Sequence, residues 1–116
     1  MSESEARAAF DDLAEDLGRH GAVTSQMFGK RALKHESKAF ACLLGGTLAF
    51  KLMAGTAEHT EALALPGAEL FDPSGKHRPM KDWVAVPVAC AEHWRPLALV
   101  SLNRLRPSAE STGAVS

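Results

Sequence analysis

The sequence has no tyrosine, only two cysteines and no long apolar run. Its hydrophobic segments are interrupted by Gly, Lys or Pro well before the roughly 20 apolar residues that a membrane-spanning helix needs. Cys42 and Cys90 both stand in apolar surroundings, which is typical of small buried side chains in a reducing compartment rather than of a disulfide framework. The sequence therefore predicts neither a membrane span nor a structural disulfide.

A large net charge is also lacking, because 13 basic residues balance 14 acidic ones. A near-neutral chain is not expected to bind nucleic acid over its whole surface. The N-terminus, MSESEARAAF, carries acids where a secretion signal has basic residues followed by an apolar segment. We therefore expect a cytoplasmic protein.

The residue patterns of catalysis are missing as well. The five histidines have no partner at metal-ligand spacing, and no serine or cysteine stands in a nucleophile motif. Gly45 and Gly46 are not followed by the Gly-Lys-Ser/Thr ending of a phosphate-binding loop. Paired carboxylates occur only on the first predicted helix, where dense charge usually faces solvent. The sequence thus predicts no enzyme activity, no metal and no cofactor.

What is present is the pattern of one α+β domain. A first amphipathic helix runs from Ser2 to the glycines at 18–21, because Phe10, Leu13 and Leu17 recur at helical spacing. Short apolar segments separated by turn residues then predict three strands, a short helix capped at Thr56, two further strands and a last helix, over 31–34, 39–44, 47–52, 55–65, 68–71, 82–86 and 92–106. The prediction is a five-stranded antiparallel sheet with flanking helices, in the order α-β-β-β-α-β-β-α, over residues 1–106, followed by a disordered tail at 107–116.

The most specific local signal is the Gly45-Gly46 pair, which suits a two-residue hairpin turn. Counting outward from it pairs Leu44 with Thr47 and assigns side chains to two faces. The first face is wholly apolar and comprises Ala39, Ala41, Leu43, Leu48, Phe50 and Leu52, and the second comprises Phe40, Cys42, Leu44, Thr47, Ala49 and Lys51. The second face is still apolar enough to suggest cover by a helix or a partner chain. Its residues Phe40, Cys42 and Leu44 are our candidates for self-association.

Two groups of basic residues could bind a ligand. One group, Lys30, Arg31 and Lys34, lies on or beside the first strands, and the other, Lys76, Arg78 and Lys81, surrounds the loop SGKHRPMK. Such clusters can neutralise phosphates on a nucleic acid or nucleotide, although the chain has few aromatic side chains on which bases would stack. Binding of phosphate is therefore one hypothesis, and ordinary solvated lysines are the other.

Several segments resemble the N-terminal domain of the TfoX/Sxy competence regulators, which is related in fold to YjbR-like proteins. They are Met27-Phe28-Gly29, the strand at Phe40-Ala41 that continues through the glycine hairpin to Leu48, Phe50, Lys51 and Leu52, then Gly75-Lys76, Arg78-Pro79-Met80 and Val86-Pro87. They occur in the family's order and span most of the chain. Lys30 departs from the family, which often has a second glycine there.

The resemblance implies a small α+β domain with a curved antiparallel sheet. It also implies a non-catalytic regulatory or protein-interaction role, because family members that carry a further helical domain are associated with natural competence. We expect a protein partner or self-association, with nucleic-acid or nucleotide binding as the alternative. Met27 and Phe28 are expected to fill the core beneath the first helix or, together with Arg78-Pro79-Met80, to form one edge of a binding groove.

Overall fold

Six strands form one antiparallel sheet, in the spatial order β1-β2-β3-β4-β6-β5, in the computed structural model. The structure describes residues 3–27, 29–73, 75–76 and 78–105. The elements are α1 (Glu3–Gly18), β1 (Val23–Met27), β2 (Lys30–His35), β3 (Lys38–Leu44), β4 (Thr47–Lys51), α2 (Ala57–Leu63), β5 (Glu69–Phe71), β6 (Met80–Pro87), the 3-10 helix η1 (Val88–His93) and α3 (Trp94–Leu105). The predicted α+β class is confirmed.

The predicted number of strands is wrong, because Val23–Met27 forms an additional strand, β1, at one edge of the sheet. Its side chains are all exposed or half-buried. The segment therefore does not show the regular alternation of apolar and polar residues by which a strand is recognised in a sequence. The predicted tail at 107–116, and Phe28, lie outside the described residues.

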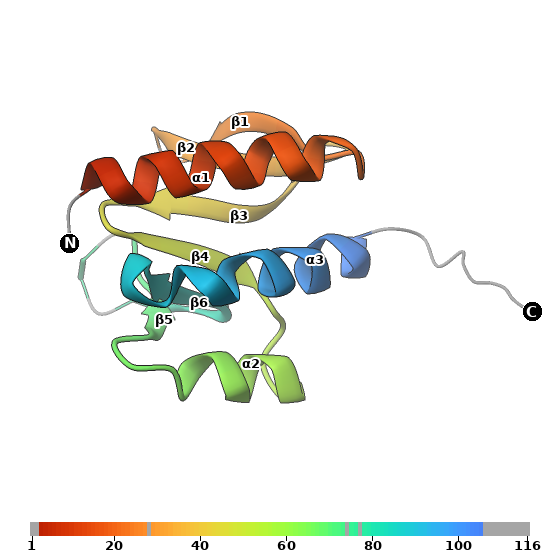
Figure 1. The fold of residues 1–116 in the computed structure, drawn as a ribbon. Helices are drawn as coiled ribbons and strands as arrows, with labels where there is room; N and C mark the ends of the chain where they lie inside the picture. The colour runs from red at the N-terminus through yellow and green to blue at the C-terminus, as the bar shows by residue number, and fades with distance from the viewer. Residues whose placement is uncertain (1–2, 28, 74, 77, 106–116) are drawn as a thin grey trace, which may run out of the picture.

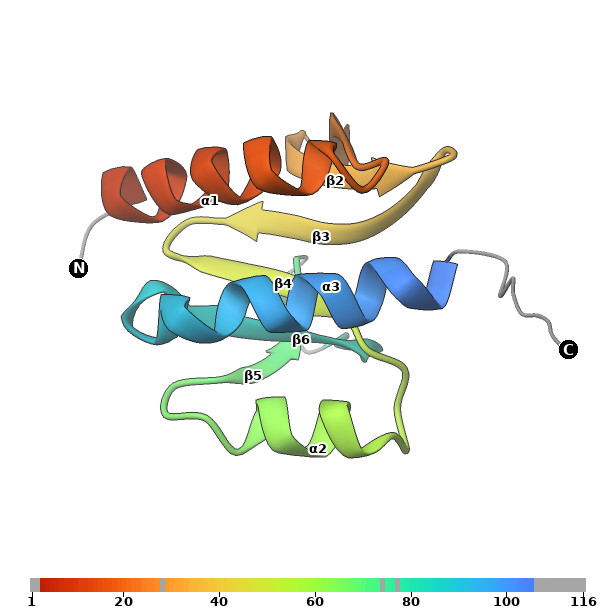
Figure 2. The ribbon, with the colours of Figure 1, turned by 45° about the vertical axis from the view of Figure 1, so that its right-hand side comes forward.

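The helices are distributed unequally over the sheet. Helices α1 and α3 run across one face, and α2 packs at the lower margin against β6 and α3 (Figures 1 and 2). We call this the helix-covered face. Within the described part of the chain no helix lies on the opposite face, which we call the open face. None of the described helices is long and apolar enough to cross a membrane.

The hairpin predicted at Gly45-Gly46 is confirmed in its register. Leu44 pairs with Thr47, and Cys42 pairs with Ala49. The preceding hairpin turns at Glu36 and Ser37, which both take the positive φ angles of 51° and 73° that a two-residue turn requires.

The face predicted for Phe40 is wrong. Lys34 of β2 lies opposite Ala39, but its neighbour Leu33 lies opposite Ala41. Phe40 therefore has no partner of its own in β2 and is an extra residue in β3. Such a β-bulge breaks the alternation of side chains. Phe40 therefore lies in the helix-covered core and Ala39 packs on the open face, each opposite to its predicted side.

Each face of the sheet has its own apolar cluster. The larger cluster, on the helix-covered face, joins α1, α3 and the sheet through Phe10, Leu17, Leu48, Phe50, Trp94 and Leu102, among others. The smaller cluster, on the open face, consists of Cys42, Ala49, Phe71, Trp83 and Ala85. Met27 packs against this second cluster, so its predicted place beneath the first helix is wrong.

Helix α2 begins where the sequence predicts. The Thr56 hydroxyl accepts a hydrogen bond from the backbone N–H of His59 at 3.2 Å. The buried His59 ring bonds the carbonyl oxygen of Lys81 through Nε2 at 2.7 Å, and since a carbonyl only accepts, Nε2 carries the proton. This bond joins α2 to the first residues of β6.

Candidate functional site

The two basic groups predicted from the sequence are not brought together. Lys30, Arg31 and Lys34 lie on β2, whereas Lys81 lies on β6, and strands β3 and β4 stand between them. Three strand spacings separate the two backbones by about 14 Å. The two groups therefore lie on different strands, with two strands between them.

Residues of the first group also point in different directions. The Arg31 guanidinium lies 3.3 Å from the Asp11 carboxylate of α1, on the helix-covered face. Lys30 is its neighbour in the strand and therefore points to the open face, where its charge acts on the Cys42 thiol. Lys34, two residues beyond Ala32, is half-buried on the same side as Lys30.

The loop between β5 and β6 is organised by its own aspartate. The two carboxylate oxygens of Asp72 accept hydrogen bonds from the backbone N–H groups of Gly75, at 3.1 Å, and Arg78, at 3.2 Å. Such bonds from an aspartate to the following backbone are typical of a self-contained turn. The Arg78 side chain is exposed, and its guanidinium has no hydrogen bond or ion pair with any residue that the structure describes.

Arg31 and Lys30 do share a hollow with a residue that sequence reasoning missed. This hollow, the basic hollow, has a volume of about 330 Å³ and is lined by Glu3, Arg7, Gln26, Gly29, Lys30, Arg31, Leu43 and Gly45. Arg7 comes from α1, and Gln26 from β1. No signal in the sequence identified Arg7, because its place beside Arg31 depends on how α1 lies across the sheet.

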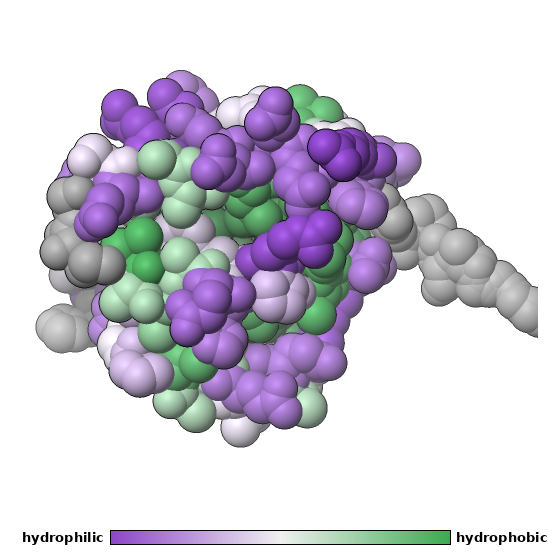
Figure 3. All heavy atoms as spheres, viewed as in Figure 1, coloured by the Kyte–Doolittle hydropathy of each residue, from purple (hydrophilic) through white to green (hydrophobic). Residues whose placement is uncertain are grey.

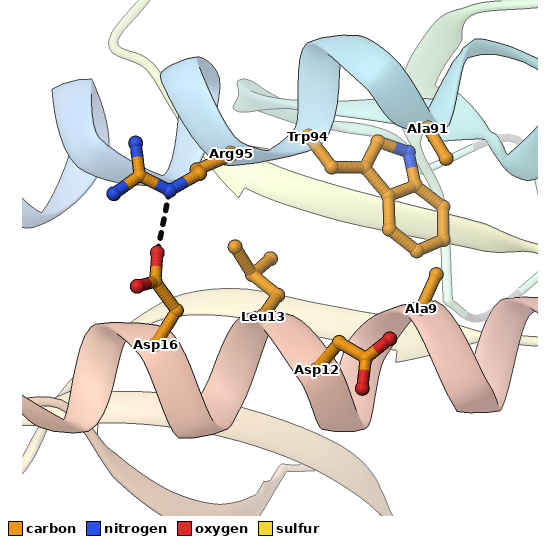
Figure 4. Close-up of a pocket in the computed structure, with 7 residues that line it drawn as sticks. All are labelled: Ala9, Asp12, Leu13, Asp16, Ala91, Trp94 and Arg95. Carbon is orange, nitrogen blue, oxygen red and sulfur yellow. Dashed lines mark hydrogen bonds and ion pairs between the residues drawn. The ribbon is translucent and has the colours of Figure 1, made fainter.

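A second hollow lies between α1 and α3. It has a volume of about 400 Å³, with an apolar floor that includes Leu13 and Trp94 (Figure 4). At its rim Arg95 binds the Asp16 carboxylate, and this hydrogen bond and the charge of Arg95 lower the pKa of Asp16. A carboxylate committed to an arginine in this way is not available as a general base near neutral pH. Figure 3 shows hydrophilic residues over much of this side, with hydrophobic residues visible between them.

The largest of these hollows, about 680 Å³, lies on the open face. Its lining combines apolar residues of the sheet with residues of the loop after β5: Leu44, Thr47, Glu69, Leu70, Phe71, Asp72, Gly75, Pro79 and Ala85. We call it the open-face hollow. Among the described residues its lining contains no cysteine, histidine, lysine or serine, and its polar side chains are those of Thr47, Glu69 and Asp72.

Of the three predicted self-association residues, only Leu44 is accessible. Phe40 is in the helix-covered core, and Cys42 is fully buried beneath the open face. Burial raises the pKa of the Cys42 thiol to about 11, with a small opposing effect from Lys30. The thiol is therefore protonated at neutral pH and is a packing residue. Leu44 is half-buried and lines the open-face hollow.

Metal-binding groups are not assembled in the part of the chain that the structure describes, where no three side chains of His, Cys, Asp or Glu stand close enough to hold an ion. Comparisons with protein-family models, with curated proteins and with solved structures found no match. The function must therefore be inferred from the geometry of the hollows and of the sheet.

Proposed function

We propose that this chain is a non-catalytic regulatory domain that binds another protein on its open face, as a domain of the TfoX/Sxy N-terminal type. The observation that carries the proposal is the open-face hollow. It is the most spacious of the hollows described above, and none of the helices that the structure describes covers its apolar residues.

The composition of the hollow suits a protein ligand. Leu44 offers apolar surface above the buried Phe71 and Ala85, while Glu69 and Asp72 place carboxylates in the lining. Protein interfaces commonly combine an apolar centre with a polar rim, and their strongest contacts are aromatic or arginine side chains inserted into pockets. We therefore expect the partner to insert an apolar side chain flanked by a basic one.

The experiment compares baits that differ only at this surface. The wild-type chain and the Leu44→Glu and Glu69→Lys variants are immobilised, and bound protein and nucleic acid from a native lysate are both assayed. Ala57→Glu, an exposed change on α2, is the matched control. A protein retained by the wild type and the control, and lost with either hollow variant, supports the proposal. Equal retention by all four baits contradicts it, provided that circular dichroism shows each variant folded.

A second candidate function is phosphate binding at the basic hollow. Three basic residues, Arg7, Lys30 and Arg31, line this hollow together with Glu3, and Arg31 is also paired with Asp11. We expect a short single-stranded oligonucleotide to bind weakly at low salt and to dissociate as salt rises. Arg7→Ala should weaken this binding, whereas Arg78→Ala, in the other basic group, should not. Absence of binding at low salt would remove this candidate.

A further inference from the structure

The two edges of the sheet are protected very differently. Strand β5 is only three residues long, includes Glu69 and has an irregular register between Leu70 and Phe71. Short length, charge and bulges are the devices by which proteins stop an edge strand from pairing with another chain. Strand β1 has five residues in regular register, and none of them is charged or a proline.

Two residues of β1 direct their backbone groups away from the sheet. Met27 and Lys30 close the β1–β2 hairpin across two residues, and such a closing pair is hydrogen-bonded. Hydrogen-bonded and non-bonded pairs alternate along an antiparallel ladder, so Ser25 also bonds β2 while Thr24 and Gln26 do not. The β2–β3 hairpin gives an independent check. The same alternation along β2 makes His35 bond to β3, as expected for the hydrogen-bonded pair His35–Lys38 that closes that hairpin.

The N–H and C=O groups of Thr24 and Gln26 therefore face outward. Outside the sheet, none of the described residues forms a backbone hydrogen bond with them. Figure 1 shows β1 at the margin of the sheet, with α1 crossing in front of it rather than lying beyond its edge. Four backbone groups are thus available to another strand.

We propose that a second copy of this chain adds its own β1 antiparallel to this edge, with Thr24 opposite Gln26 of the second copy. In this register each copy's Thr24 lies opposite the other copy's Gln26, so outward-facing backbone groups meet in both Thr24–Gln26 pairs. The two Ser25 residues lie opposite each other on the two-fold axis. It also overlaps all five residues of each strand. Two-fold dimers are the commonest homo-oligomers, and their interface must be complementary to itself.

The side chains of β1 fit the same register. Val23 is 61% exposed, which is unusual for a residue of its size, and Met27 already packs against the open-face cluster. By alternation they share one side of the strand, so Val23 meets Met27 of the second copy. A hollow of about 350 Å³ beside Val23, lined also by Ser25 and Lys34, gives that methionine room. No charged residue of β1 faces its copy, so the pairing brings no like charges together.

The interaction deepens the proposed function, because it names one partner of the domain and joins the two open faces into one continuous surface. It uses neither Leu44 nor Glu69, so it fails or succeeds independently of binding at the open-face hollow. A contact made mainly by two five-residue strands is small compared with permanent interfaces. We therefore expect a reversible dimer that forms at high protein concentration.

Analytical ultracentrifugation from low micromolar to millimolar concentration tests the proposal. The wild-type chain should pass from monomer to dimer. Gln26→Pro removes an outward N–H without removing a bond to β2, and Thr24→Lys adds a charge of the kind that protects natural edges. Both variants should stay monomeric over this range. Ala57→Lys, an exposed change on α2, should behave as the wild type.

A cross-link tests the register directly. Residues on the two-fold axis form a non-hydrogen-bonded pair with close Cα atoms, so Ser25→Cys should give a disulfide-linked dimer under mild oxidation. Cys42 and Cys90 are buried and contribute little background. A wild-type chain that stays monomeric at the highest concentration overturns the proposal, as does a dimer that the β1 variants leave intact or that Glu69→Lys, at the open-face hollow, abolishes. If Gln26→Pro unfolds the chain, Thr24→Lys and the cross-link still decide between these outcomes.

Discussion

The two faces of the sheet are built from the same strands but are covered in different ways. On the helix-covered face, α1, α3, η1 and part of α2 all contribute residues to one large cluster. On the open face, among the residues that the structure describes, half-buried side chains of the sheet such as Met27 and Met80 pack against the small cluster. The first face is where most of the apolar area is removed from water, and that burial is the main favourable term in folding.

The helix-covered face therefore provides most of the stability, and the open face is left to provide a binding surface. The open face keeps a large hollow beside well-buried residues such as Phe71 and Trp83, which form a tilted ring pair with centroids 5.8 Å apart. Buried residues beneath the surface fix its shape, while Leu44 and Glu69 at the surface are available to a partner. A domain of this size can hold such a surface because its other face provides the core.

The largest effect is expected at Phe50, on the helix-covered face. This residue is fully buried in β4, at the centre of the large cluster. Phe50→Ala should lower the free energy of unfolding by about 3–5 kcal/mol, because the surrounding helices and strands cannot close the cavity. Urea unfolding followed by far-ultraviolet circular dichroism measures it. A loss below about 1 kcal/mol would show that the helix-covered core is not the main source of stability.

The same substitution on the open face should cost less. Phe71 is almost as buried as Phe50, but it packs in the small cluster, beside a loop that can relax into the space. We expect Phe71→Ala to lower the free energy of unfolding by about 3 kcal/mol, at the low end for a phenylalanine. The two variants form a matched pair in the same urea experiment. If Phe71→Ala costs more than Phe50→Ala, the comparison between the faces must be reversed.

The stability of the protein at alkaline pH should show whether water reaches the Cys42 thiol beneath the open face. Burial raises the pKa of Cys42 to about 11 from its ordinary value of 9.0, so the folded chain keeps a proton that the unfolded chain releases between these values. Stability therefore falls as pH rises from about 9 to 11, by up to about 3 kcal/mol, and is unaffected at neutral pH. Cys42→Ala should remove this part of the decline.

The measurement is the difference between the unfolding free energies of the wild type and Cys42→Ala, in reducing buffer at neutral pH and at about pH 10.5. The difference should shift in favour of the variant at the higher pH. Parallel pH profiles for the two proteins would mean that water reaches the thiol and that the small cluster is not a desolvated core.

These expectations depend on features that the sequence predicted to different extents. The register at Gly45-Gly46 and the cap at Thr56 were predictable because each depends on the local chemistry of a turn or a helix end. The bulge at Phe40 was not, because it arises from the conflict between two hairpin registers that are each locally regular. β3 is apolar on both faces, so its hydrophobic pattern could not reveal the extra residue.

The candidate sites were less predictable than the fold. An edge strand such as β1 buries little of either face, so its sequence resembles a loop. The basic hollow joins Arg7 and Arg31 from elements far apart in the chain, and the open-face hollow depends on where the loop after β5 lies. Charge along the sequence identified Lys30 and Arg31 but not Arg7, which comes from the first helix.

The smallest effect is expected at an ion pair on the rim of the helix-covered side. The hydrogen bond and charge of Arg95 lower the pKa of Asp16 below its ordinary value of 3.8. The stabilisation this gives is present above about pH 4 and is lost as the pH falls through the lowered pKa of the folded chain. Arg95→Ala should therefore destabilise the protein slightly at neutral pH and less at an acidic pH, as Asp16 becomes protonated, and the pair's exposure keeps the effect small. Arg78→Ala is the matched control, because it removes an arginine from the loop beside the open face without breaking an ion pair that the structure describes. It should have no pH-dependent effect. Urea titrations at the two pH values compare the two variants. Equal pH dependence in both would mean that the Asp16–Arg95 pair adds nothing to the joining of α1 and α3.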